Sequence, residues 1–239
     1  WRIAGGSGDG IDSTSQNFTK ALMRYGLHVI THRHYPSRIR GGHTFVEVRA
    51  SDEPVASRGD GYNFLLALGD SFARNPDEDA LYGDEEIKPL SENLDDLREG
   101  GVIVYDSGVL DAEDVPDLEE RAEENDWSVY PVDLRSMAQE HGREVMRNTA
   151  GVGVTASFIG MPLDPIQELM SEAMPEKILE PNLKVLEDAY QWAETEAKQT
   201  HDVSIPDAEH DEEQALISVS HAISYGAIDE GCRFISGYP

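Results

Sequence analysis

The sequence predicts an α/β fold, in which helices cover both faces of a mostly parallel sheet in a three-layer domain. Short apolar stretches typical of buried strands recur along the chain, and segments with helical spacing or acidic helical faces lie between them. The chain has 239 residues, 39% of them hydrophobic, which is enough for one large or two modest domains. No apolar run reaches the roughly 18 residues that a membrane-spanning helix needs.

The opening elements follow a strand–turn–helix–strand order. A strand at Trp1–Ala4 leads into a glycine-rich turn at Gly5–Asp12. Apolar residues at helical spacing predict a helix over Ser13–Tyr25, and Gly26 is suited to end it. The next strand is expected at Leu27–Thr31. This order predicts the opening of a parallel sheet covered by helices.

Four further stretches are predicted strands. The run YNFLLAL is almost continuously apolar, as expected of a central strand buried on both faces. Pro131 cannot donate a ladder hydrogen bond, so the last strand is expected at an edge or near its end. The predicted strands are Thr44–Arg49, Tyr62–Leu68, Gly101–Asp106 and Ser128–Val132.

The remaining segments predict helices. The run NTAGVGVTASFIGM at Asn148–Met161 fits a strand, but its length favours a buried helix whose glycines let neighbouring elements approach closely. The other candidates are a partly helical segment at Glu85–Leu97, an acidic helix at Pro116–Asn125, and amphipathic helices at Pro165–Met174 and Asn182–Lys198.

These elements make one Rossmann-like domain over residues 1–198. Residues 199–214 form an acidic linker, because Thr200–Gln214 has almost no core residues and is interpreted as solvated. An apolar helix is then expected at Ala215–Ala227 and a strand at Cys232–Ile235. A helix and a strand alone are not a domain, so residues 215–239 are interpreted as the truncated start of a second α/β domain.

The charge is strongly acidic, with 47 Asp and Glu against 19 Lys and Arg and a formal net charge of -28. Such self-repulsion opposes compact structure, but at about 1 M salt the Debye length is roughly 3 Å and the repulsion is screened. The even distribution of acids predicts a high-salt cytoplasm; the alternative is an acidic protein that binds a basic partner. Phosphate repulsion argues against nucleic acid, and nothing predicts a signal peptide or membrane binding.

The single cysteine, Cys232, excludes an internal disulfide and an iron–sulfur cluster held by this chain alone, which needs about four thiolates. A small buried hydrophobic residue is the expected role of this cysteine.

A basic island at Thr31–Arg49 contrasts with the acidic remainder, since its only acid is Glu47. Its arginines are expected to meet carboxylates or phosphates, through internal ion pairs, a subunit or domain contact, or a phosphate site. Gly41 and Gly42 support the last two because paired glycines allow close backbone approach. No metal site is expected, since no Asp, Glu or Cys lies at suitable spacing from the histidines. The island contains Arg33, Arg38, Arg40, Arg49, His32, His34 and His43.

The glycine-rich turn resembles phosphate-binding loops but fails their strict patterns. Gly6 and Gly8 match two positions of the dinucleotide fingerprint, but Ile11 occupies the third. Gly5 and Gly10 have the spacing of a Walker loop, but Ile11 again stands where its lysine belongs. NAD and ATP are therefore not the expected ligands.

Acidic residues also oppose a pyrophosphate at this turn, since Asp9 and Asp12 add negative charge there. One interpretation is a tight turn in which Asp12 or Ser13 caps the following helix. The other is a turn that packs against a subunit or a flexible ligand.

Four motifs occur in a recognisable order: GGSGDGID, HRHYPSRIRGGHT, NTAGVGVTASFIGMP and EPNLKVLEDAY. Together they resemble the gamma-type domain of 2-oxoacid:ferredoxin oxidoreductases. The tail SYGAIDEGCRFISGYP is similar to the opening of the family's alpha domain, the thiamine-pyrophosphate pyrimidine-side domain. The order of gamma domain, linker and alpha domain is that of the fused alpha subunit of archaeal enzymes, and the acidity suggests a halophilic type.

The resemblance implies a reaction in which a 2-oxoacid, coenzyme A and oxidised ferredoxin give acyl-CoA, carbon dioxide and reduced ferredoxin. It implies thiamine pyrophosphate with Mg between the alpha subunit and a beta subunit, and an iron–sulfur cluster in a partner polypeptide. Pyruvate and 2-oxoglutarate are the candidate substrates, with 2-oxoglutarate slightly favoured by the first motifs. Ferredoxin and the beta subunit are the expected partners, in a heterodimer.

The resemblance also assigns residues. Gly5, Gly6, Gly8, Gly10, Arg38, Gly41 and Gly42 match the gamma signature, which implies subunit packing and closure over coenzyme A. Arg38 and Arg40 are the candidates for the coenzyme A phosphates or an interface.

At the other end of the chain, Tyr238 and Pro239 match the edge of the family's substrate motif, while Val219-Ser220-His221 departs from the usual Gly-Asn-Glu. The resemblance implies that the family's substrate-binding threonine and catalytic glutamate would follow Pro239, so no catalytic residue is expected in this segment, and alone it is expected to be inactive. The alternatives are a Rossmann-like nucleotide-binding enzyme and a stand-alone interaction module.

Overall fold

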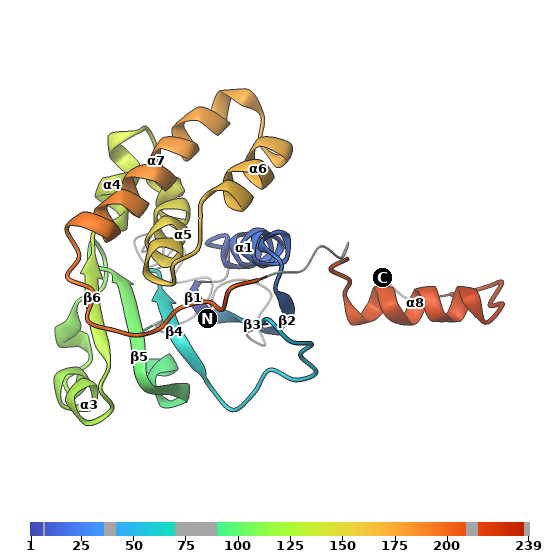
Figure 1. Cartoon of the computed structure of the whole chain (residues 1–239), viewed down its shortest axis with the longest axis horizontal. Helices are drawn as coiled ribbons and strands as arrows, with labels where there is room; N and C mark the ends of the chain where they lie inside the picture. The colour runs from blue at the N-terminus through green and yellow to red at the C-terminus, as the bar shows by residue number, and fades with distance from the viewer. Residues whose placement is uncertain (7, 36–41, 70–89, 209–214, 237–239) are drawn as a thin grey trace, which may run out of the picture.

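The computed structural model describes residues 1–6, 8–35, 42–69, 90–208 and 215–236. Its centre is a six-stranded sheet in the order β2-β3-β1-β4-β5-β6 (Figure 1). Strands β1, β4, β5 and β6 run parallel, and β3 is antiparallel to both of its neighbours. The predicted α/β class with a mostly parallel sheet is confirmed. The strands are β1 (Arg2–Gly6), β2 (His28–His34), β3 (His43–Ser51), β4 (Tyr62–Ala67), β5 (Leu97–Asp106) and β6 (Ser128–Val132).

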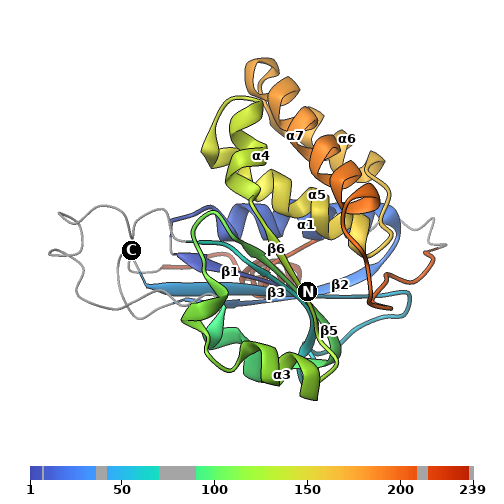
Figure 2. The ribbon, with the colours of Figure 1, turned by 90° about the vertical axis from the view of Figure 1, so that its left-hand side faces the viewer.

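Helices cover both faces of this sheet (Figure 2). On one face α1 (Ile11–Tyr25) and α5 (Arg147–Phe158) lie against the strands, and α4, α6 and α7 lie outside them. On the other face α3 (Leu118–Glu124) packs near β5 and β6. Within the described ranges, no helix is long and apolar enough to cross a bilayer. The outer helices are α4 (Leu134–Glu140), α6 (Asp164–Ala173) and α7 (Glu176–Thr195), and the 3-10 turns are η1 (Ser91–Asp96), η2 (Ala112–Asp114) and η3 (Glu144–Met146).

The opening strands differ from a simple parallel pair. Strand β2 does not contact β1, because β3 lies between them and pairs antiparallel with each. Val46, for example, is opposite Ile3 on one side and Arg33 on the other. A connection as short as residues 35–42 suits an antiparallel pair, whereas parallel neighbours need a crossover of about a dozen residues or more. Strand β6 lies at the sheet edge, as Pro131 predicted.

Helix α5 confirms the prediction of a buried helix with close neighbours. A Cβ on Gly151 would lie 3.0 Å from a methyl group of Leu66 on β4. A Cβ on Gly153 would lie only 2.6 Å from the carbonyl oxygen of Leu186 on α7. The two glycines therefore allow α5 to fit between the sheet and α7.

Several helix bounds differ from the predictions; for example, α5 ends at Phe158 rather than Met161, and α7 ends at Thr195 rather than Lys198. Helix α4 and turn η3 were not predicted, because elements of only seven and three residues are too short for an apolar pattern to identify them. Helix α7 begins at Glu176, six residues before its predicted start at Asn182, and it includes Pro181 within its second turn. Helix α1 begins at Ile11 rather than at Ser13.

The first part of the expected linker packs against the domain. Residues 200–208 form no helix or strand, but Val203, Ile205 and Ala208 pack against the core. The backbone N–H of Ile205 donates to the carbonyl of Ile159 at 2.9 Å, and the ring of His201 lies 5.3 Å from that of Phe158. The expectation of a solvated segment without core residues is therefore wrong here, because three spaced apolar side chains suffice to anchor it.

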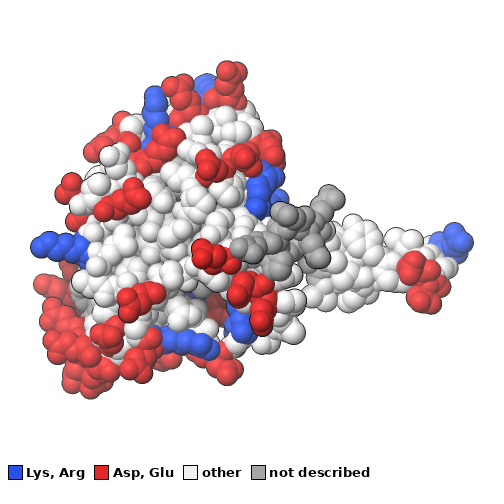
Figure 3. Space-filling model, viewed as in Figure 1, with Lys and Arg blue, Asp and Glu red and all other residues white. Residues whose placement is uncertain are grey.

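Helix α8 (Val219–Asp229) begins four residues after the predicted start of the apolar helix at Ala215. None of its residues is buried, and it extends away from the sheet (Figure 1). Its surface carries charge only toward its end (Figure 3). The expected strand at Cys232–Ile235 is absent, and Cys232 is exposed instead of buried. Both expectations are wrong because this segment packs against nothing within the described chain that would form a core around it.

Alanine substitution of two helical glycines is predicted to change the free energy of unfolding in different ways. Gly153→Ala should lower the free energy of unfolding by about 1–3 kcal/mol, because its methyl group would clash with the Leu186 carbonyl. Gly226→Ala on α8, where a Cβ meets nothing within 4 Å, should be neutral or raise helicity slightly. Denaturant unfolding of both variants checks this. Equal effects would mean that α5 is not closely packed.

Two isoleucines test which segments belong to the folded body. Ile205→Asn should lower the free energy of unfolding by about 1–2 kcal/mol, because it removes an apolar side chain that packs against the core. Ile223→Asn should change it by less than about 0.5 kcal/mol, because Ile223 is 67% exposed on α8. The same unfolding assay checks both; if the loss at position 205 is no larger than at 223, the packing of residues 200–208 is wrong.

Candidate functional site

The candidate site lies at the carboxyl ends of β1 and β4. After β1 the chain passes into α1 on one face of the sheet, whereas η1 and α3, which precede and follow β5, pack on the other face. In open α/β sheets a crevice forms where neighbouring connections leave to opposite faces, outside the carboxyl ends of the strands. The glycine-rich turn after β1 occupies this position.

The glycine-rich turn is a tight turn made possible by two left-handed glycines. The N–H of Asp9 donates to the carbonyl of Gly6 at 3.1 Å, and Gly8 and Gly10 have φ of 100° and 79°. Gly10 is the N-cap of α1, and no side chain caps this end. The prediction that Asp12 or Ser13 caps the helix is wrong, since α1 starts early enough to place both residues within its first turn.

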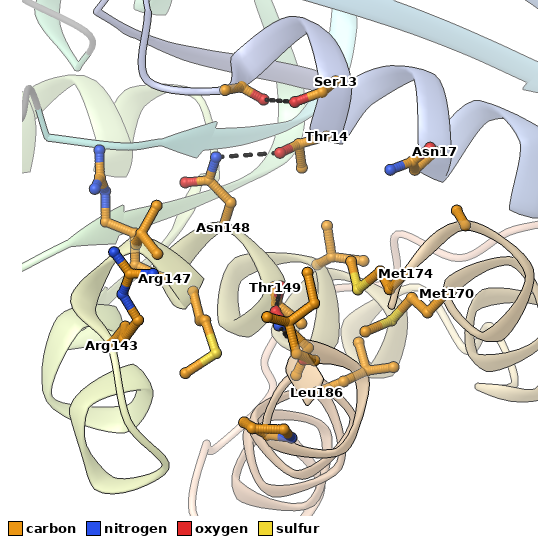
Figure 4. A pocket seen from close by; sticks show the side chains of 18 of the residues that line it. Ser13, Thr14, Asn17, Arg143, Arg147, Asn148, Thr149, Met170, Met174 and Leu186 are labelled. Atoms are coloured by element: carbon orange, nitrogen blue, oxygen red, sulfur yellow. Dashed lines mark hydrogen bonds between the residues drawn. The ribbon is translucent and has the colours of Figure 1, made fainter. Parts of the chain in front are cut away.

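Helix α5 holds this turn through its first two residues. The Asn148 amide donates to the carbonyl of Asp9 at 2.8 Å and to the hydroxyl of Thr14 at 3.1 Å (Figure 4). Arg147 forms a 3.3 Å ion pair with the Asp9 carboxylate. Asp9 and Arg147 are only 7% and 4% exposed. The turn is thus a rigid, charge-compensated element, and its acid is neutralised within the protein.

The basic island begins at the same edge of the sheet. His43, the first residue of β3, is paired with Gly6 in the sheet register, so β3 begins beside the glycine turn. Arg33 pairs with Asp12 in the first turn of α1 at 3.0 Å, and Arg49 donates to the carbonyl of Ser57 at 3.0 Å. Internal contacts therefore account for these two arginines.

The other island candidates are placed only in part. Gly42 has φ of 85°, which suits a glycine at the end of this hairpin. Arg38, Arg40 and Gly41 lie outside the described residues, as do Tyr238 and Pro239.

The island histidines do not converge. His32 and His34 are exposed on β2, where the ring of His34 stacks on Phe45 at 4.8 Å. His43 is 8% exposed, and its Nε2 lies 3.2 Å from the side-chain nitrogen of Asn93. Burial lowers the pKa of His43 to about 4, so it is neutral near pH 7. Within the described part of the chain, no three His, Cys, Asp or Glu residues are arranged to hold a metal ion.

Next to His43 lies a buried cluster that the sequence did not reveal. Arg2 on β1 donates to Glu47 at 3.1 Å, to Asn93 at 3.1 Å and to Asp96 at 2.7 Å. Its guanidinium lies 4.2 Å and 4.1 Å from the ring centres of Phe45 and Tyr62. The cluster joins β1, β3, β4 and η1 on the face opposite α1. Burial raises the pKa of the Tyr62 hydroxyl, which keeps it protonated.

A cleft of about 830 Å³ opens between the glycine turn and the outer helices. One wall, from α1 and α5, carries Ser13, Thr14, Asn17, Asn148 and Thr149, and the facing wall includes Met170 and Met174 of α6 and the following turn (Figure 4). Arg143 and Arg147 lie together at one end of it (Figure 4). Sequence reasoning missed this cleft because it did not predict α4 and η3; the basic residues at 141, 143 and 147 in so acidic a chain were the available signal.

Comparison with known proteins gives a family match. The family model described as "Pyruvate ferredoxin/flavodoxin oxidoreductase" matches residues 1–192. The indolepyruvate oxidoreductase subunit IorB of Archaeoglobus fulgidus is 28% identical over 80% of this chain and 93% of its own length. The 2-oxoacid:ferredoxin oxidoreductase subunit alpha of Sulfolobus sp is 22% identical over 100% of this chain but only 40% of its own length.

The fold also matches a solved structure, the 2-oxoglutarate:ferredoxin oxidoreductase from Magnetococcus marinus with 2-oxoglutarate, coenzyme A and succinyl-CoA bound. The TM-score is 0.77 at 22% identity, over 95% of this chain and 36% of that one. This chain therefore has the fold of one part of a longer polypeptide of that kind.

The buried His43 predicts a pH dependence of stability. As the pH falls below 6.5, the unfolded chain protonates this histidine while the folded chain keeps it neutral until about pH 4. Folding stability is therefore lost as the pH falls through this range, by about 1–2 kcal/mol at pH 5. His43→Asn should flatten the pH profile by this amount, and His32→Asn should not. Thermal unfolding at constant ionic strength measures it; parallel profiles for wild type and His43→Asn would contradict the burial.

Proposed function

Because the chain belongs to the pyruvate ferredoxin/flavodoxin oxidoreductase family, we propose that it is part of the alpha subunit of a 2-oxoacid:ferredoxin oxidoreductase. The enzyme would oxidatively decarboxylate 2-oxoglutarate or pyruvate to acyl-CoA and reduce ferredoxin. The main support for this proposal is the share of the chain over which it is similar to known alpha subunits. The match to the Sulfolobus alpha subunit runs over the whole chain, whereas the match to the shorter indolepyruvate subunit covers 80% of it.

The exposed tail supports a fused alpha subunit. Helix α8 presents Val219, Ile223, Tyr225 and Ile228 to solvent, and Phe234 and Ile235 follow it. Burying such side chains stabilises each by roughly 1.5–3 kcal/mol, so a segment of this kind belongs inside a larger core. We assign residues 215–239 to the start of the thiamine-pyrophosphate pyrimidine-side domain, joined by the 199–214 segment to the gamma-type domain at 1–198.

For the gamma-type domain we propose a role in subunit packing and in closure over coenzyme A. Arg38, Arg40, Gly41 and Gly42 belong to the sequence between β2 and β3, and β3 begins at His43, which is paired with Gly6 of the glycine turn. The N-terminus of α1 adds a partial positive charge at this edge, which favours an anion there. Arg38 and Arg40 are the proposed contacts for the coenzyme A phosphates or for a neighbouring subunit.

The cofactors belong to the assembled enzyme. Thiamine pyrophosphate with Mg would lie between this subunit and a beta subunit, and the iron–sulfur cluster would lie in the partner, since this chain has a single cysteine. Thiamine pyrophosphate, when bound, supplies the electron sink that protein side chains lack. The chain alone is proposed to be inactive and to work as a heterodimer in a high-salt cytoplasm.

Native purification of the parent protein from its own cells tests the proposal. The parent is purified anaerobically in multimolar KCl and assayed for viologen reduction with pyruvate or 2-oxoglutarate, with and without coenzyme A. Activity that requires coenzyme A and co-elutes with a cysteine-rich second subunit supports the proposal and names the substrate. A monomer without partner or activity would instead favour a stand-alone interaction module, and the exposed apolar α8 also suits such a module. The other alternative, a nucleotide-binding enzyme, would bind NADH.

The island arginines give a kinetic prediction in the assembled enzyme. Arg38→Gln with Arg40→Gln should raise the KM for coenzyme A by about tenfold or more, because each charge-assisted hydrogen bond to a phosphate contributes about 1.5–3 kcal/mol. The KM for the 2-oxoacid should not change. Arg24→Gln, which removes only surface pairs with Glu168 and Glu172, is the matched control. An unchanged KM for coenzyme A with loss of the beta subunit would assign these arginines to the interface.

A further inference from the structure

The two edges of the central sheet are protected to different degrees (Figure 1). At one edge, β6 contains Pro131, which has no N–H to offer to a further strand. The chain after α7 also lies against this strand. The N–H of Thr200 donates to the hydroxyl of Tyr130 at 2.9 Å, and the hydroxyls of Thr200 and Ser128 are 2.9 Å apart. This edge is therefore poorly suited to accept another strand.

Strand β2 forms the other edge and has none of these features. It has seven residues, which is longer than the usual strand of about five or six. It pairs with β3 in one continuous register without a bulge, and it contains no proline. Among the residues that the structure describes, no strand lies on its outer side. The outward N–H and C=O groups of such an edge are a template for pairing with another chain.

Strand β2 also lacks the charges that commonly prevent edge pairing. Its sequence, HVITHRH, has no acid and no lysine, in a chain with 47 Asp and Glu. Its one arginine, Arg33, is paired with Asp12 of α1 at 3.0 Å. Three consecutive β-branched residues, Val29, Ile30 and Thr31, favour an extended backbone. The composition of β2 therefore permits the addition of a further strand.

We propose that β2 pairs antiparallel with β2 of a second copy of this chain, so that the two sheets join across a two-fold axis beside Thr31. Such a two-fold contact uses the same surface on both copies. The pairing places Thr31 opposite its counterpart, Ile30 opposite the partner's His32, and Val29 opposite the partner's Arg33. No two side chains of like formal charge lie directly opposite each other, which is the arrangement that destabilises strand pairs.

Charge favours a second copy over another kind of partner. Because each copy has a net charge of -28, two copies can meet closely only where carboxylates are absent from both surfaces, as they are along β2. An acidic strand would meet one arginine that Asp12 already neutralises, and a basic strand would meet no acid on β2. Neither would gain from charge.

The pairing also limits the size of the assembly. Once the two β2 strands are joined, the free ends of the combined sheet are the two β6 edges, which are poorly suited to pairing. The assembly therefore closes as a dimer and does not extend into a fibre. This contact goes beyond the proposed function, since it requires neither a beta subunit nor a cofactor.

Sedimentation velocity of the full chain tests the pairing, in the lowest KCl concentration at which thermal unfolding shows the chain fully folded. The wild type should form a concentration-dependent dimer. Thr31→Glu and Thr31→Lys should each weaken dimerisation by about tenfold or more, because two like charges then lie opposite each other. An equimolar mixture of the two variants should regain the dimer, because it brings opposite charges together. Loss of the fold could not be rescued in this way.

Ile223→Lys on α8 is the matched control, because it adds the same charge to a helix without buried residues, and it should leave the dimer unchanged. Dissociation of the dimer by this variant, with no effect of either Thr31 variant, would assign self-association to α8 and overturn the proposal. A wild type that stays monomeric up to its solubility limit would also overturn it, as would a mixture of the Thr31 variants that dimerises no better than its components.

Hydrogen exchange gives a direct measurement of the strand contact. The outward amides within Val29–Arg33 should be protected at high protein concentration and should exchange faster on dilution, because dissociation exposes them to water. Exchange of these amides that does not depend on protein concentration, in samples that contain the dimer, would contradict the pairing.

Discussion

The close packing of α5 between the sheet and α7 is the constraint on which the rest of the structure depends. Gly151 and Gly153 lack the methyl groups that would hold Leu66 and the Leu186 carbonyl away. Because α5 lies so near the strands, its first turn reaches the end of β1. There Asn148 and Arg147 hold the glycine turn by its backbone and by the Asp9 carboxylate. The geometry of the candidate site thus follows from side-chain volume several residues away.

The few cations of this chain are used in two distinct ways. Arg2, Arg135 and Arg147 are buried and paired with acids; Arg135, for instance, donates to Asp106 at 3.2 Å. Burial still raises the pKa of Asp106, so the cost of desolvating the two charges offsets part of their attraction. Such pairs fix how β1, β5, α4 and α5 meet more than they add stability. Arg143 and Lys177, by contrast, line the cleft and pair with no acid among the residues that the structure describes.

Local sequence patterns predicted most of the strands and helices. They did not predict the strand order or the residues that meet at the cleft, because both depend on packing between distant segments. Apolar runs located all six strands, and the small-residue run located α5. The position of β3 between β1 and β2 was not predictable from the same runs, because an antiparallel insertion depends on pairing across the sheet. The glycine positions of the turn were found in the sequence, whereas Arg143, Arg147 and the methionine wall converge from three separate segments. Cys232 was misjudged because an apolar composition does not supply a core to pack against.

The contrast between residues 200–208 and α8 shows which parts of the chain form one folded unit. The first segment packs against the core of the sheet domain through His201 and Ile205, as far as Ala208. Helix α8 has only 11 residues and no buried side chain, and an isolated helix of that length is marginal in water. Its order must therefore come from contacts that the body does not provide. Residues 200–208 therefore belong to the same folded unit as the glycine turn and the cleft.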